Sequence, residues 1–68
     1  MKRIDTSGFS CPEPVIMTKK ALKDSPDALT VIVDNVASRE NVKRFGEATG
    51  YKVDVKEEGS KWTLVLAR

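Results

Sequence analysis

The chain's only cysteine lies beside two prolines, and its surroundings limit the chemistry that the sequence allows. Cys11 is followed by Pro12, Glu13 and Pro14. Because the 68 residues contain no second cysteine and no histidine, an intrachain disulfide and the ordinary zinc ligand sets are excluded. The lack of histidine also removes the usual base that activates a thiol. We expect no metal and no cofactor, and any covalent chemistry requires another feature that stabilises the Cys11 thiolate.

The prolines predict a helix that begins at Cys11 or Ser10. Proline is favoured in the first helical turn, because the backbone N–H that it lacks has no partner within the helix. A thiol at a helix start meets unpaired N–H groups and the positive end of the helix dipole. This placement can lower a cysteine pKa from about 8.5 to between roughly 3.5 and 7.5, although the Glu13 carboxylate opposes part of the shift. The stiff helix start would present the sulfur to a partner protein.

A second interpretation of the cysteine stays open. Lone cysteines in small proteins are usually buried and behave as small hydrophobic residues. Ser10, Pro12 and Glu13 are not typical of a core, and the position at a helix start is specific. The local context leaves the reactive thiol and the buried thiol evenly balanced.

The predicted helix is amphipathic and ends at residues 25–27, where a proline stops it. Its apolar face comprises Pro14, Val15, Met17, Thr18, Ala21 and Leu22. The opposite face carries Lys19, Lys20, Lys23 and Asp24, with Ile16 as an apolar residue among them. The lysines and Ile16 are candidates for a surface that binds an acidic partner, although an ordinary solvated helix face is the commoner explanation.

Strands are predicted on both sides of this helix. Residues 2–5 form a short strand that ends at turn residues 6–8, and residues 29–33 form a central strand rich in β-branched side chains. Residues 51–56 and 61–66 alternate strictly and predict a hairpin with its turn at residues 57–60. A second helix lies between the central strand and the hairpin. We expect Ser38 as its N-cap, Gly50 at its end and an inward stripe of Val42, Phe45, Ala48 and Thr49.

The order β-α-β-α-β-β predicts a two-layer α/β (α+β) sandwich. We expect a four-stranded mixed sheet with both helices on one face, in a single domain over residues 1–68. A chain of this length is near the lower limit for folding without disulfides or metal. It leaves little room for an enclosed active site, so we expect chemistry at the surface. The sequence leaves open whether it is a whole protein or an excised domain.

Charge and hydropathy narrow the partners and the location. Twelve basic and ten acidic residues are interspersed and give a formal charge of +2, which disfavours direct nucleic-acid binding. No stretch approaches the roughly 20 apolar residues that span a bilayer, and the first residues lack the apolar run of a signal peptide. We therefore expect a cytoplasmic location and no membrane contact.

Asp5, Gly8 and the Cys11-Pro12-x-Pro14 motif, followed by an amphipathic helix and a β-α-β-β remainder, resemble the TusA family of sulfur-carrier proteins. The family is also called SirA-like, and the resemblance covers essentially the whole chain. Residues 34–45 are similar to the amino-terminal domain of YedF-type proteins, which are associated with selenium metabolism. Those proteins often carry a second, DsrE-like domain, which this sequence lacks.

The resemblance implies a sulfur relay that acts through a cysteine persulfide. Cys11 would accept sulfane sulfur from a donor such as a cysteine desulfurase and pass it to an acceptor protein. Pro12 and Pro14 would shape the helix start, Gly8 would allow the turn beneath it, and Asp5 would accept hydrogen bonds from that turn. The alternative is a non-catalytic interaction or regulatory module with an incidental cysteine, so the sequence leaves open whether the protein is a sulfurtransferase-type enzyme.

Overall fold

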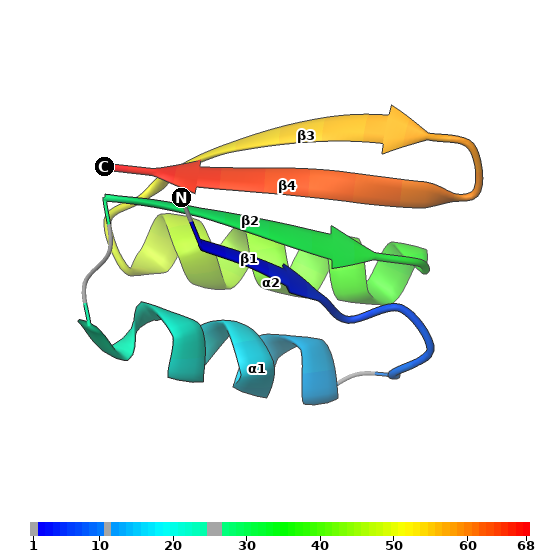
Figure 1. Ribbon diagram of the computed structural model, residues 1–68, viewed down its shortest axis with the longest axis horizontal. Coiled ribbons are helices and arrows are strands. Elements are labelled where there is room, and N and C mark those ends of the chain that lie inside the picture. The colour runs from blue at the N-terminus through cyan, green and yellow to red at the C-terminus, as the bar shows by residue number, and fades with distance from the viewer. Residues whose placement is uncertain (1, 11, 25–26) are drawn as a thin grey trace.

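The computed structural model describes residues 2–10, 12–24 and 27–68. The elements are β1 (Lys2–Asp5), α1 (Glu13–Ala21), the 3₁₀ helix η1 (Leu22–Asp24), β2 (Ala28–Val33), α2 (Val36–Ala48), β3 (Lys52–Glu58) and β4 (Lys61–Ala67). The strands form one sheet in the order β1-β2-β4-β3. β1 is parallel to β2, and the other pairs are antiparallel. Both helices lie on one face of the sheet (Figure 1), so the predicted architecture is confirmed.

The core lies between the helices and the two central strands. One face of β2 contributes Leu29, Val31 and Val33, which are fully buried because they alternate with residues of the opposite face. The facing residues of β4 are Leu64 and Leu66, which are also fully buried. Burial of each such side chain contributes about 1.5–3 kcal/mol. This apolar layer holds α1 and α2 against the sheet.

The predicted N-cap of α2 is wrong by three residues. Asn35, in an extended conformation, is the cap, and its Oδ1 accepts the Ser38 backbone N–H at 2.8 Å. Ser38 lies inside the first turn and is fully buried. Both residue types cap helices well. Asn35 is the cap because β2 ends at Val33 and the helix follows almost immediately.

The face of α2 that packs on the sheet also differs from the prediction. Ser38, Val42 and Gly46 are its buried residues, whereas Phe45 is half-buried and Ala48 and Thr49 are exposed. A Cβ at Gly46 would lie 2.8 Å from Leu66 Cδ2 and 2.9 Å from Val53 Cγ2. The missing side chain therefore lets α2 approach the sheet closely, and this contact decides which face turns inward.

The ends of α2 and of the hairpin follow the predicted turn chemistry. Gly50 has φ +94°, and the Tyr51 and Gly50 N–H groups donate to the Gly46 and Glu47 carbonyls at 3.0 and 3.1 Å. This is the Schellman arrangement that ends a helix at a glycine. The hairpin turn is shorter than predicted, since residues 57 and 58 belong to β3 and only Gly59 and Ser60 form the turn. No helix in the described ranges is long and apolar enough to cross a membrane.

Candidate functional site

The helix after the cysteine begins later than predicted. α1 starts at Glu13 with Pro12 at its N-cap position, and its first helical bond runs from the Ile16 N–H to the Pro12 carbonyl at 3.0 Å. A helix capped at Ser10 would put the Pro14 ring against the Ser10 carbonyl, four residues earlier. With the later start, Pro14 is the second helical residue, where no N–H is needed. Cys11 itself lies outside the described residues.

A tight turn connects β1 to this helix start. The Thr6 N–H and Oγ1 both donate to the Ile32 carbonyl, at 2.9 and 2.6 Å, and hold the chain to the end of β2. The Phe9 N–H then donates to the Thr6 carbonyl at 3.1 Å. Gly8 occupies the third position of this turn with φ +86°, a conformation that favours glycine. The Ser7 N–H donates to Asp5 Oδ1 at 2.9 Å, so the turn is fixed at both ends.

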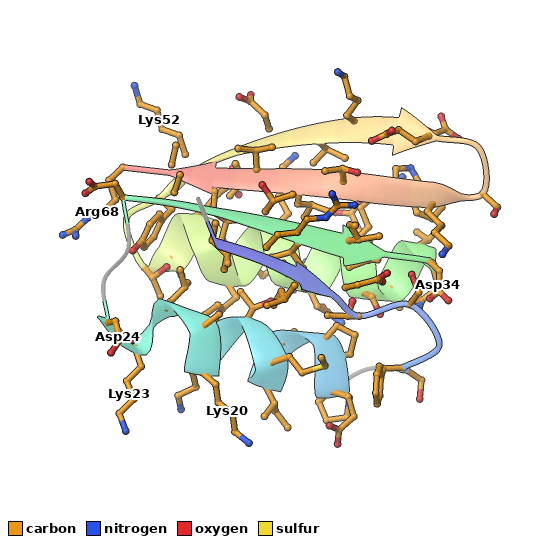
Figure 2. All side chains as sticks on the ribbon, in the orientation of Figure 1. Lys20, Lys23, Asp24, Asp34, Lys52 and Arg68 are labelled. Atoms are coloured by element: carbon orange, nitrogen blue, oxygen red, sulfur yellow. The ribbon has the colours of Figure 1, made fainter. Side chains whose placement is uncertain are left out.

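Asp34 is a residue of this region that the sequence analysis missed. Its Oδ2 accepts the Gly8 N–H at 2.8 Å, and its Oδ1 accepts from Asn35 Nδ2 at 3.2 Å. It therefore links the loop after β1 to the start of α2, and Figure 2 shows it at the end of β2 beside that loop. Asp34 comes directly after β2, which is parallel to β1, and parallel strands end at the same edge of a sheet. This position in the sequence is the signal that could have identified Asp34.

Hydrogen bonds lower the pKa of both carboxylates of this region. The side chain and the backbone N–H of Ser7 lower the pKa of Asp5. The backbone N–H of Gly8 and then the Asn35 side chain lower the pKa of Asp34. Both groups therefore remain charged acceptors at neutral pH, and the loop keeps its hydrogen bonds there.

The two helix starts lie at the same end of the molecule. β1 and β2 run parallel, and α1 and α2 each follow one of them, so both helices begin beside the loop 6–10 (Figure 1). Each helix presents the positive end of its dipole at that end. Ser10, Pro12 and Glu13, which flank position 11 in the sequence, are exposed. The arrangement favours a negative charge at this end of the protein.

The predicted partner surface forms one patch that extends from α1 onto η1. A surface depression of about 570 Å³ is lined by Ile16, Lys19, Lys20 and Lys23. Ile16 is 40% exposed, so an apolar side chain lies among three cations. Lys20 of α1 and Lys23 of η1 both project away from the sheet (Figure 2). The structure thus brings together all four residues that the sequence analysis named.

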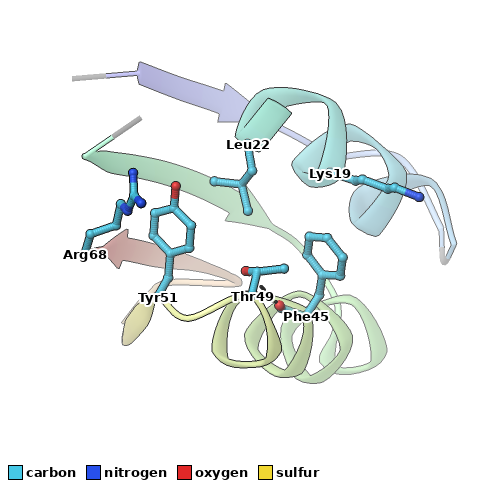
Figure 3. Close-up of a pocket in the computed structure, with 6 residues that line it drawn as sticks. All are labelled: Lys19, Leu22, Phe45, Thr49, Tyr51 and Arg68. Atoms are coloured by element: carbon cyan, nitrogen blue, oxygen red, sulfur yellow. Dashed lines mark hydrogen bonds between the residues drawn. The ribbon is translucent and has the colours of Figure 1, made fainter. Parts of the chain in front are cut away.

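A second depression lies between the helices, at the end opposite to the two helix starts. It has a volume of about 400 Å³ and is lined by Lys19, Leu22, Phe45, Thr49, Tyr51 and Arg68 (Figure 3). The Arg68 guanidinium lies 5.8 Å from the centroid of the Tyr51 ring. The backbone N–H of Arg68 donates to the Asp27 carbonyl, just before the start of β2, whereas the loop at Gly8 is held at the end of β2. This depression is therefore separate from the region around Asp5, Gly8 and Pro14.

Comparison with known proteins identifies the family. Residues 2–68 match the family model described as Sulfurtransferase TusA. The chain belongs to the TusA family. It is 41% identical over 71 residues to a "Putative sulfur carrier protein" of Methanocaldococcus jannaschii, covering 100% of this chain and 95% of that protein. It is 31% identical over 70 residues to the TusA sulfur carrier protein of Allochromatium vinosum, covering 98% of this chain and 92% of that protein.

A solved structure agrees with the TusA assignment. The SirA-like protein of Desulfitobacterium hafniense superposes with a TM-score of 0.89 at 34% identity, covering 98% of this chain and 96% of that one. This protein is therefore a TusA-family sulfur carrier, and carriers of this family relay sulfur between proteins. The predicted resemblance and the predicted fold are both confirmed at the level of the family.

Proposed function

We propose that Cys11 carries the sulfur as a persulfide. The observation that supports this most directly is that a sulfur-carrier chain has one thiol, and Cys11 is that residue. Its sequence neighbours Ser10, Pro12 and Glu13 are exposed, and two helices begin at the same end of the molecule. A thiolate there benefits from both helix dipoles and needs no histidine.

The transfer needs no external oxidant. The Cys11 thiolate attacks the terminal sulfur of a donor persulfide, so a new S–S bond forms while the donor's S–S bond breaks and the donor leaves as a thiolate. In the second step, a nucleophile of the acceptor attacks the terminal sulfur on Cys11. The bond between the two sulfurs breaks, and the Cys11 thiolate is regenerated. The protein's part is to keep this thiolate accessible to two partners in turn.

The lysine-rich face of α1 and η1 is the proposed docking surface for these partners. It comprises Ile16, Lys19, Lys20 and Lys23. The first three lie on α1, which begins two residues after Cys11, and Lys23 lies on η1 directly after it. Cations around an exposed apolar side chain suit a partner with an acidic surface and an apolar contact at its centre. A cysteine desulfurase is the proposed donor, and the acceptor is a second protein that binds after the donor leaves.

A second part of the proposal concerns the YedF-type branch of the family. The similarity of residues 34–45 to YedF-type proteins supports selenium as an alternative cargo, with a DsrE-like domain, fused or separate, as a partner. The competing function is an interaction module in which Cys11 takes no part. The mass of the protein after loading distinguishes these alternatives: selenium adds a larger increment than sulfur, and the interaction module gains none.

Loading followed by intact mass spectrometry tests the proposal. The protein is incubated with a cysteine desulfurase, cysteine and pyridoxal phosphate, and a sulfur-sized mass increment is expected. The Cys11→Ser variant, which changes a single atom of the side chain, should show none. An increment that survives in Cys11→Ser, or no increment in the native chain, would contradict the persulfide role. Repeating the reaction with selenocysteine and a matching lyase tests whether selenium is accepted.

A further inference from the structure

Strand β3 is a long, regular and exposed sheet edge. It pairs with β4 on one side, and no described strand lies on its other side (Figure 1). It has seven residues, whereas the opposite edge strand β1 has four. All of its residues except the half-buried Val53 are exposed. The backbone N–H and C=O groups along such an edge can pair with another strand.

The hairpin determines which backbone groups face the open edge. β3 and β4 are joined by Gly59 and Ser60, and Glu58 pairs with Lys61 across the turn. A two-residue hairpin closes on a pair that exchanges backbone hydrogen bonds, and such pairs recur at every second residue. The even-numbered residues 52–58 therefore direct their backbone groups toward β4. Val53, Val55 and Glu57 direct theirs toward the open edge.

The side chains on the outer face of β3 alternate in charge. Val53 and Val55 share the helix-facing side, because they pair with the core residues Leu66 and Leu64. The other side carries Lys52, Asp54, Lys56 and Glu58. Lys52, Asp54 and Lys56 lie opposite Ala67, Val65 and Thr63 of β4, none of which is charged. Within the described ranges these three charges have no ion pair, and Lys52 projects outward from β3 (Figure 2).

We propose that β3 pairs with the β3 strand of a second copy of this chain, antiparallel and centred on Val55. In this register Lys52 lies opposite Glu58 of the partner subunit, and Asp54 lies opposite Lys56 of the partner subunit. The twofold axis repeats both pairs, so each of the four charges on the outer face of β3 meets its opposite. Val53, Val55 and Glu57 supply the backbone groups of the new ladder. Val55, which is 40% exposed, packs against Val55 of the partner subunit.

The alternation of charge selects this register over its neighbours. A shift of two residues in one direction places Asp54 opposite Asp54 of the partner subunit. The same shift in the other direction places Lys56 opposite Lys56 of the partner subunit. Like charges directly opposite each other destabilise a strand pair. A twofold interface needs a surface that is complementary to itself, and among these registers only the one centred on Val55 has that property.

The dimer leaves the region around Gly8 and Pro14 accessible. A twofold axis perpendicular to the sheet keeps all helices on one face. β1, which leads into that region, lies at the edge of the sheet farthest from β3. Pairing through β3 therefore does not compete with docking at α1. The inference is independent of the proposed persulfide chemistry.

Sedimentation equilibrium of charge variants tests this interface. Edge pairing alone buries little surface, so we expect weak association, visible between about 10 μM and about 1 mM. Lys56→Glu and Asp54→Lys each place like charges opposite each other and should raise the dimer Kd on the order of tenfold or more. The double variant Asp54→Lys with Lys56→Glu restores opposite charges and should return the Kd to within about threefold of the native value.

Two further variants separate the interface from general effects. Lys23→Glu changes the net charge as Lys56→Glu does, but it lies on η1 and should leave the Kd unchanged. Val55→Pro removes an N–H that faces the open edge and should abolish dimers while circular dichroism stays native. A native chain that remains monomeric, or a double variant that fails to recover, would overturn the proposal. If dimers form while sulfur loading fails, the persulfide role alone is refuted.

Discussion

At the scale of the residue, two hydrogen-bonded carboxylates hold the turn that follows β1. Asp5 and Asp34 each accept backbone N–H groups from the loop that follows β1. Their role is to fix the Gly8 turn. Because the chain has no histidine, the proposed reactivity of Cys11 relies on helix dipoles rather than on an imidazole base.

The thiol pKa separates a carrier from a module with an incidental cysteine. We expect a Cys11 pKa below the free value of about 8.5, because two helix starts lie at this end of the molecule. Monitoring thiolate absorbance against pH, together with the rate of iodoacetamide alkylation, measures it. The same titration of the urea-unfolded chain is the control. A pKa equal in both states, with slow alkylation of the folded protein, would favour the incidental cysteine.

At the scale of the element, two residues determine where α2 begins and how closely it packs against the sheet. Asn35 caps the helix, and Gly46 allows contact with Leu66 and Val53. Neither feature depends on helix propensity alone. For both residues, the expected effect of an alanine substitution on the free energy of unfolding therefore differs from what helix propensity predicts.

The two candidate caps of α2 should respond differently to alanine. Asn35→Ala removes the bond to the Ser38 N–H and should lower the free energy of unfolding by about 1 kcal/mol. Ser38→Ala removes a buried hydroxyl that has no hydrogen-bond partner in the described part of the chain. It should be neutral or slightly stabilising. Urea denaturation of both variants measures the difference, and a larger loss for Ser38→Ala would contradict the assigned cap.

Gly46→Ala should destabilise the protein even though alanine favours helices. The added methyl group would lie 2.8 Å from Leu66 Cδ2, and such overpacking typically costs about 1–3 kcal/mol. The gain in helix propensity is about 1 kcal/mol at most. Urea denaturation should show a net loss, and Glu47→Ala on the exposed side of the same helix is the control. A more stable Gly46→Ala variant would show that α2 can move away from the sheet without cost.

At the scale of the whole molecule, elements with one clear signal were predictable and contacts between distant elements were not. Strict alternation predicted β3 and β4, and the prolines predicted a helix start near Cys11. The exact start at Glu13 depends on avoiding the clash that the Pro14 ring would make with the Ser10 carbonyl in a helix that begins earlier. The bond from Gly8 to Asp34 joins residues that are 26 positions apart. Only the parallel pairing of β1 and β2 brings these two residues together.

Stability should fall in acid because of the carboxylates that fix the loop. Hydrogen bonds lower the pKa of Asp5 and Asp34 in the folded state, so their contribution is complete above the unfolded pKa of about 3.9. It is lost as the pH falls through the folded pKa values. Urea denaturation between about pH 7 and pH 3 measures this loss. The double variant Asp5→Asn with Asp34→Asn should show a shallower decline, and an unchanged decline would contradict the assignment.

The position of β4 has a consequence for how the chain folds during synthesis. β4 follows every other element in the sequence, yet it lies between β2 and β3 in the sheet. A nascent chain that ends before Lys61 has a β3 strand without its neighbour and a β2 strand with one side unpaired. The core face of β2 then lacks Leu64 and Leu66. The sheet can therefore close only after β4 has left the ribosome, so folding of the domain is completed after β4 is translated.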